Sequence, residues 1–173
     1  MPIRLYDLDP DTVALAAFEQ LLAQVTRITA ALGSRQPDVP APQKSHVYRQ
    51  VSELARWAIE GKPPRTTRVA ERAADLAQLC GVRITGEPAL PLELVLQGAV
   101  ARTKLEAGEP LDANEISILI GFDRDSVIGL AARVPGGYRL ETALRKPWRF
   151  KSTSALRTWI DEKSGGRLLR QSA

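Results

Sequence analysis

The sequence is poor in the residues that build disulfide frameworks and histidine-based sites. Its 173 residues include one cysteine, Cys80, and one histidine, His46. A single cysteine excludes an intramolecular disulfide, and a single histidine excludes a cluster of histidine metal ligands. Cys80 lies in the helical pattern RAADLAQLC, which indicates a small buried core residue rather than a nucleophile.

Motifs for catalysis and cofactor binding are also missing. The sequence has no Cys-x-x-Cys pair, and no glycine-rich phosphate loop or Ser-x-x-Lys in a convincing context. Asp7, Asp9 and Asp11 have the first three ligand spacings of a calcium loop, but Thr12 and Phe18 replace its glycine and glutamate. A turn at the start of a helix explains these aspartates better. We therefore expect no enzyme activity, no cofactor and no metal.

Long apolar runs are absent, and aromatic residues make up only 5% of the chain. No apolar segment approaches the roughly 20 residues of a membrane span, and MPIRLYDLDP lacks the apolar core of a signal peptide. We therefore expect a soluble, cytoplasmic protein with no membrane partner. The hydrophobic content of 44%, rich in Ala and Leu, favours a packed, mainly α-helical fold.

Four amphipathic segments predict helices over residues 10–33, 45–60, 66–80 and 91–107. We expect Asp11 to cap the first, and Thr66 or Thr67 to open the third. The apolar stripe of the first comprises Leu15, Phe18, Leu22, Val25, Ile28 and Leu32. Residues 1–88 are thus predicted to be a helical region that forms a small bundle or a surface for oligomerisation.

Positive charge is concentrated at the C-terminal end of the chain. Residues 133–173 hold ten basic and three acidic residues, or +7, whereas the other 132 residues hold fourteen basic and seventeen acidic ones, or −3. A solvated surface usually mixes both signs. The asymmetry therefore favours a polyanion partner for the C-terminal part.

The stretch LDANEISILIGFDRDSVIGLAARV, residues 111–134, predicts two short helices separated by a turn. Asp112 and Glu115 have the spacing of a capping box, Gly121 suits the positive φ of a tight reversal, and Asp123 caps the second helix. Phe122 is expected to pack inward. This pattern predicts a helix-turn-helix, although an ordinary corner between two helices gives the same pattern.

The segments that follow extend the pattern. VPGGYRL predicts a turn and a strand, RKPWRF a second strand, and STSALRTWIDEK a capped amphipathic helix. With Trp148-Arg149-Phe150 before Leu156 and Trp159-Ile160, residues 110–162 resemble the winged helix-turn-helix of excisionases and MerR-type regulators. Together with the N-terminal helices, these segments predict a mainly α fold, in which an N-terminal helical bundle precedes a winged helix-turn-helix domain with a small β-hairpin over residues 89–173. The resemblance implies a transcriptional regulator, or a recombination or DNA-packaging accessory factor, of a phage or other mobile element.

The resemblance implies that duplex DNA is the partner and that a homodimer or higher homo-oligomer binds it. Arg124 and Ser126 would meet base edges at the start of the second helix. The other predicted contacts lie over phosphates and comprise Arg133, Arg139, Arg145, Lys146, Arg149 and Lys151. Because Asp123 and Asp125 bring negative charge to the same helix, a second function stays open. It is a structural or adaptor protein of a larger assembly that uses the winged helix for protein contacts.

Overall fold

The computed structural model describes residues 3–35, 38–39, 41–140 and 147–167. The protein is mainly helical, as the sequence predicts, and has a small three-stranded antiparallel sheet. The N-terminal elements are η1 (Leu5–Asp7), α1 (Pro10–Ala31), η2 (Pro42–Lys44), α2 (His46–Glu60), α3 (Val69–Cys80) and α4 (Pro91–Ala107). The C-terminal elements are β1 (Leu111–Asp112), α5 (Ala113–Ile120), α6 (Arg124–Leu130), β2 (Gly137–Arg139), β3 (Trp148–Phe150) and α7 (Ser154–Lys163).

One predicted cap and one predicted helix start are wrong, although α1 begins at residue 10 as expected, and local hydrogen bonds explain both differences. Asp9, rather than Asp11, caps α1, because the Asp9 carboxylate accepts a hydrogen bond from the Thr12 backbone N–H. Asp11 lies in the first turn, where it contacts Arg56 of α2. Helix α3 begins at Val69, since the Thr66 hydroxyl oxygen accepts from the Arg68 backbone N–H in a turn before the helix.

Helix α4 is the centre of the molecule, and its side chains are buried on nearly every side. Its first half packs with α1, α2 and α3 in one hydrophobic core, which includes the buried Cys80. Gly98 of α4 makes room for the buried Leu5, because a Cβ at Gly98 would lie 2.8 Å from Leu5 Cδ2. Its second half supplies Ala101 and Leu105 to another core, formed with α5, α6, α7 and the sheet. One helix thus contributes to both cores.

The sheet has the strand order β1–β3–β2, with both pairs antiparallel. Leu111 faces Phe150 across the β1–β3 pair, and Tyr138 faces Arg149 across the β2–β3 pair. The sequence predicts β2 and β3 but not β1, whose two residues are too few to show an alternating pattern. Since Leu111 and Phe150 are fully buried, one face of the sheet closes the second core.

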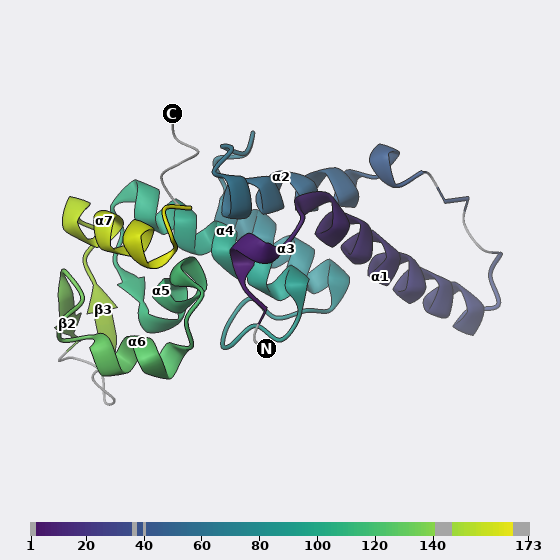
Figure 1. The fold of residues 1–173 in the computed structure, drawn as a ribbon. Helices are drawn as coiled ribbons and strands as arrows, with labels where there is room; N and C mark the ends of the chain where they lie inside the picture. Colours follow the sequence, from purple (N-terminus) through teal and green to yellow (C-terminus); the bar gives the residue numbers. More distant parts are fainter. Residues whose placement is uncertain (1–2, 36–37, 40, 141–146, 168–173) are drawn as a thin grey trace.

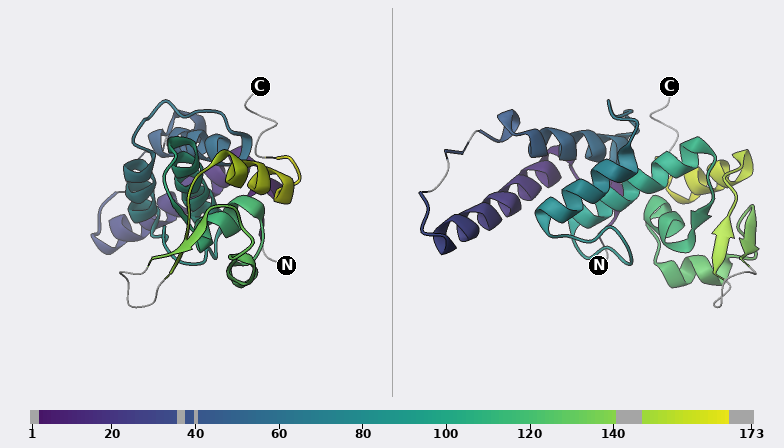
Figure 2. Two further views of the ribbon diagram at one scale, coloured as in Figure 1. Left: turned by 90° about the vertical axis from the view of Figure 1, so that its left-hand side faces the viewer. Right: turned by 180° about the vertical axis from the view of Figure 1, so that it is seen from behind.

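The molecule is elongated, with α1 at one end and the sheet with α6 and α7 at the other (Figures 1 and 2). The buried residues of α1 end at Phe18, and its second half extends away from α2 as Figure 1 shows. Ile28 and Leu32, which belong to the apolar stripe predicted for this helix, are 60% and 73% exposed there. Among the described residues, no helix combines the length and apolar character needed to cross a membrane.

Candidate nucleic-acid interface

A tight turn joins α5 to α6, and its hydrogen bonds confirm the predicted caps. The Asp112 carboxylate accepts from the Asn114 and Glu115 backbone N–H groups at 2.9 Å, and the Glu115 carboxylate accepts from the Asp112 N–H at 2.8 Å. At the other end of α5, Gly121 has φ 71° and donates to the Ser117 carbonyl at 2.9 Å. The left-handed backbone at Gly121 ends α5 and turns the chain into α6.

Helix α6 exposes its first turn, whereas Val127 is buried and Ile128 and Leu130 are partly buried against the second core. The Asp123 carboxylate caps it, accepting from the Ser126 backbone N–H at 2.7 Å and from the Ser126 hydroxyl at 2.6 Å. These hydrogen bonds from Ser126 hold the pKa of Asp123 below its usual value, so the carboxylate stays ionised. The Ser126 hydroxyl proton is therefore engaged, although its oxygen remains an acceptor. The guanidinium of Arg124 lies 3.8 Å from the Asp125 carboxylate in an exposed pair.

The β2–β3 hairpin follows α6 and lies beside it (Figures 1 and 2). Arg139 and Lys151 are both exposed, and each lies over an aromatic ring. The Arg139 guanidinium is 5.2 Å from the Trp148 ring centre, and the Lys151 ammonium is 5.8 Å from that of Tyr138. Such cation–π contacts orient the two charges and leave them accessible to solvent.

Arg149 occupies a different environment from its neighbours on β3. Its guanidinium lies 3.3 Å from the carboxylate of Asp112, which faces it across the β1–β3 pair. Both side chains are only partly exposed, at 34% and 39%. Because Asp112 also caps α5, this ion pair links the sheet to the first helix of the turn. Nothing local in the sequence reveals this contact, which depends on the register of β1 against β3.

The structure brings together most of the predicted contact residues at one end of the molecule. Arg124 and Ser126 lie in the first turn of α6, and Arg133 is exposed just after it. Arg139, Arg149 and Lys151 belong to the hairpin or directly follow it. Arg145 and Lys146 lie outside the described residues. Trp148 and Trp159, predicted to fill the core between hairpin and last helix, are half-buried and pack against that core.

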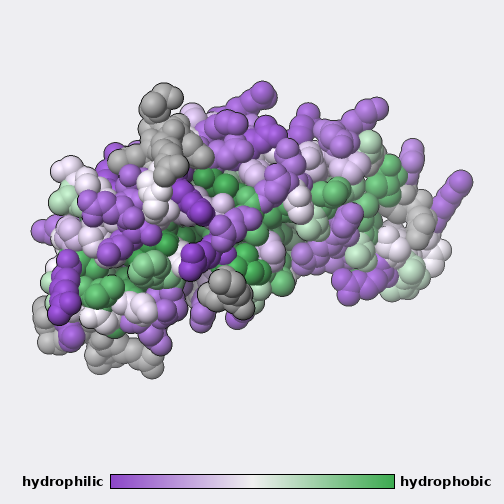
Figure 3. Space-filling model, viewed as in Figure 1, coloured by the Kyte–Doolittle hydropathy of each residue, from purple (hydrophilic) through white to green (hydrophobic). Residues whose placement is uncertain are grey.

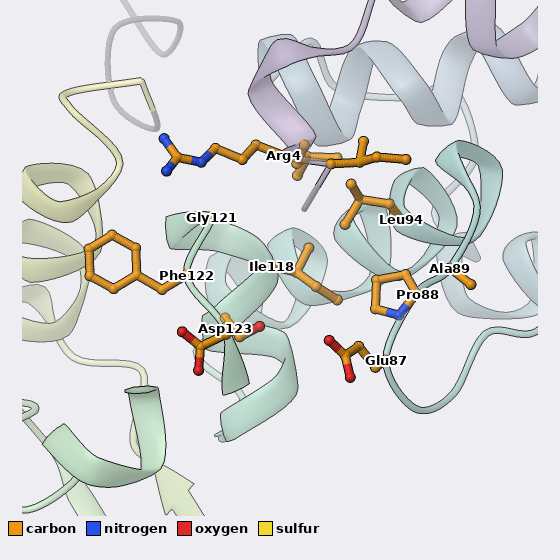
Figure 4. Close-up of a pocket in the computed structure, with 12 residues that line it drawn as sticks. Arg4, Glu87, Pro88, Ala89, Leu94, Ile118, Gly121, Phe122 and Asp123 are labelled. Atoms are coloured by element: carbon orange, nitrogen blue, oxygen red, sulfur yellow. The ribbon is translucent and has the colours of Figure 1, made fainter. Parts of the chain in front are cut away.

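Phe122 does not pack inward as predicted, since it is 39% exposed in the turn between α5 and α6. Figure 4 shows its ring turned away from Leu94 and Ile118, whereas Arg4 extends over the turn. These residues line a pocket of about 360 Å³ that also includes Glu87 and Asp123. The pocket reaches the start of α6 and joins the N-terminal segment to the candidate interface.

No protein-family model matches this chain, and neither the curated proteins nor the solved structures contain a match.

Proposed function

We propose that the chain binds duplex DNA through α6 and the β2–β3 hairpin. The observation that carries the proposal is the exposed first turn of α6, held by the Gly121 turn beside a hairpin with accessible cations. A helix with its side chains is roughly 10–12 Å across, which suits the major groove of B-DNA at about 12 Å. Helix, turn, helix, hairpin and helix follow one another here in the order of the winged helix-turn-helix that the sequence resembles.

The contacts follow from the position of each charge. Arg124, in the first turn of α6, would contact a guanine edge, and the Ser126 oxygen would accept from a base amino group. Arg133, Arg139 and Lys151 would contact phosphates, which supply salt-dependent affinity but little sequence information. Arg149 is assigned a smaller part, because Asp112 already neutralises its charge. The function that fits is a regulator, or a recombination or packaging accessory factor, that marks a DNA site.

A direct test is fluorescence anisotropy with a random-sequence duplex at low and moderate salt. The informative variant is Arg133→Glu with Lys151→Glu, since both side chains are exposed and neither forms an ion pair within the described residues. Arg149→Glu is a poor choice, because it places two carboxylates together and destabilises the sheet. Wild type should bind with an affinity that falls steeply with salt, and the double variant should lose about tenfold or more.

A matched control separates the effect of losing these two contacts from the effect of changing the net charge of the protein. Arg27→Glu with Lys44→Glu makes the same change in charge on exposed residues of α1 and η2, at the other end of the molecule. The control should bind duplex DNA within about twofold of wild type at moderate salt, where charges a Debye length away are screened. No binding at low salt, or equal losses in both variants, would contradict the proposal.

Self-association through α1 belongs to the same proposal. Beyond the buried Phe18, four apolar residues of α1 and its C-cap are spaced by four, three and four residues, the pattern of a seam between like helices. This α1 seam comprises Leu21, Val25, Ile28 and Leu32. Only Glu19 and Arg27 carry charge between Phe18 and Leu32. An antiparallel pair centred between Thr26 and Arg27 would place Leu21 of each copy opposite Leu32 of the other, and Val25 opposite Ile28. Figure 3 shows hydrophobic surface at the end of the molecule where α1 and the following segment lie.

One observation favours an alternative function, that of an adaptor. The exposed ring of Phe122 and the adjoining pocket lie beside the start of α6, where Asp123 and Asp125 add negative charge. An apolar ring near a carboxylate suits a protein contact better than a phosphate contact. An adaptor would show no salt-sensitive duplex affinity, so the anisotropy experiment distinguishes the two functions.

A further inference from the structure

A second basic surface lies away from the candidate interface, along α2. It forms a groove of about 770 Å³ between the polar face of α2, the segment that leads to α3, and α3 itself. This volume is within the range of small-molecule sites, roughly 300–1,000 Å³. In Figure 3 the surface over α2, along the upper edge of the view, is largely hydrophilic. The groove lining includes four arginines, namely Arg49, Arg56, Arg65 and Arg72.

The two carboxylates of the groove are already paired. Asp11 binds Arg56 through both of its oxygens, at 3.0 and 3.1 Å, and Glu53 lies 3.5 Å from Arg65. Within the described residues, Arg49 and Arg72 form no ion pair, and Arg72 is half-buried. Arginine keeps its charge at every physiological pH. The groove therefore holds two uncompensated guanidinium groups, which an anion would stabilise.

We propose that this groove binds a small phosphate-bearing molecule of nucleotide size. Guanidinium groups match phosphate oxygens with two parallel hydrogen bonds, and Arg49 and Arg72 are available for them. Tyr48 and His46 add rings on which a planar base can stack, and the Gln43 amide adds both donors and an acceptor. The Gln50 amide nitrogen is hydrogen-bonded to the His46 ring, which leaves the Gln50 oxygen as an acceptor. The groove thus offers phosphate, ring and polar-edge contacts in one place.

The neighbouring charges favour a compact anion over a long polyanion. Beyond the groove, Lys62 is paired with Glu60 at 2.8 Å and Arg68 with Glu71 at 3.4 Å. A nucleic-acid strand that continued past the groove would therefore meet carboxylates as well as cations. A nucleotide ends within the groove and avoids them.

Isothermal titration calorimetry on the full chain tests the proposal, with ATP and with inorganic pyrophosphate, in the absence of divalent cations. Arg49→Ala with Arg72→Ala should weaken ATP binding at least about tenfold, since two charge-assisted contacts are lost. Arg27→Ala with Arg35→Ala removes the same charge from exposed residues outside the groove and should change binding by less than about twofold. Circular dichroism checks that both variants fold.

The calorimetry distinguishes the possible outcomes. Binding of ATP that is weakened only in the groove variant supports the site. Weaker binding of pyrophosphate than of ATP measures the contribution of the base and sugar. No heat with either ligand at millimolar concentration would overturn the proposed site, as would equal binding by wild type and groove variant.

A single-stranded dT oligonucleotide serves as the third probe. If the oligonucleotide binds and ATP does not, with the loss confined to the groove variant, the small-ligand proposal is wrong and the groove contacts nucleic acid. Duplex binding by α6 does not depend on any of these outcomes.

Discussion

Single cations on the same strand are held in different ways, and their surroundings decide what each can do. Arg149 and Lys151 are two residues apart, on one face of β3 and its continuation. Arg149 is paired with Asp112 and partly buried, whereas Lys151 is exposed above the Tyr138 ring. A phosphate would have to compete with a carboxylate at Arg149 but not at Lys151. From the alternation of the sequence alone, both residues would be assigned to the same exposed face of the strand.

Tyr6 makes stability depend on pH in a way that one substitution can isolate. Burial raises the pKa of Tyr6 from 10.0 to about 12, against the opposing charge of Arg102. Below pH 10 the phenol is protonated in both folded and unfolded states, so its contribution is constant. Between pH 10 and about 12 the unfolded chain loses this proton and the folded chain keeps it. The free energy of unfolding should therefore fall by about 2–3 kcal/mol over this interval because of Tyr6.

Urea unfolding of wild type and Tyr6→Phe at pH 8, 10 and 11.5 measures this effect. The phenylalanine variant should lose less stability between pH 8 and 11.5, because it has no phenol at this position to ionise. Other titrating groups are shared by the two proteins and cancel in the difference. Parallel pH profiles would show that the Tyr6 hydroxyl is not buried in this way.

At the scale of elements, two glycines only eight residues apart should respond oppositely to alanine. Gly121 has φ +71°, whereas Gly129 lies in α6, where a Cβ would have no other atom within 4 Å. Gly121→Ala should cost about 1–2 kcal/mol, because a side chain is strained in the left-handed region. Gly129→Ala should raise stability by up to about 1 kcal/mol, through helix propensity. Urea unfolding of both variants measures the two effects, and a shared sign would contradict the assigned backbone.

Elements defined by neighbouring residues could be predicted, whereas those defined by distant partners could not. Asp112, Asp123 and Gly121 determine where α5 and α6 begin and end through bonds within a few residues, so the sequence pattern was sufficient. Strand β1 exists only because Leu111 and Asp112 pair with Phe150 and Arg149. Hydrophobicity also predicted a buried Phe122, although the orientation of the turn leaves its ring at the surface.

The same distinction applies to the two candidate sites. Arg124 and Ser126 follow directly from the cap at Asp123, so the start of α6 could be assigned from the sequence. The groove along α2 could not, because it depends on how Arg72 of α3 is placed against the polar face of α2. The net positive charge of residues 133–173 predicted an anion-binding surface in the C-terminal part of the chain. In the groove along α2, Arg49 and Arg72 differ from Arg56 and Arg65 because they form no ion pair within the described residues. Net charge does not reveal this difference.

At the scale of the whole molecule, α4 connects the helix proposed for self-association, α1, with the proposed DNA-binding end. Its first half lies in the core under α1 and α2, and its second half lies in the core behind the sheet and α5. Because α4 packs in both cores, it fixes the position of α6 relative to α1 within one copy. Self-association through α1 would therefore set the distance between the α6 helices of the two copies. Two helices presented by a dimer read half-sites about one helical turn, roughly 34–36 Å, apart. If the chain binds DNA as proposed, its oligomeric state decides how many half-sites it contacts.

The α1 seam gives the prediction that tests this organisation. Ile28→Glu with Leu32→Glu places charge on the seam, at side chains 60% and 73% exposed, so the monomer should fold as before. Ala23→Glu with Ala30→Glu makes the same change in charge on exposed residues of the opposite face of α1. Light scattering coupled to size exclusion should give a dimer for wild type and for the Ala23/Ala30 control. The seam variant should give the monomer mass of 18.9 kDa.

Duplex binding by these variants separates the role of the dimer from that of the interface. The seam variant keeps Arg133 and Lys151, so it should still bind DNA, but with a shallower dependence on salt because one copy contacts fewer phosphates. The Ala23/Ala30 control should keep the salt dependence of wild type. A wild-type protein that is monomeric at every concentration would refute association through α1. The proposed DNA contacts of α6 and the hairpin would then be tested by the Arg133/Lys151 variant alone. These residues lie at the other end of the molecule from α1.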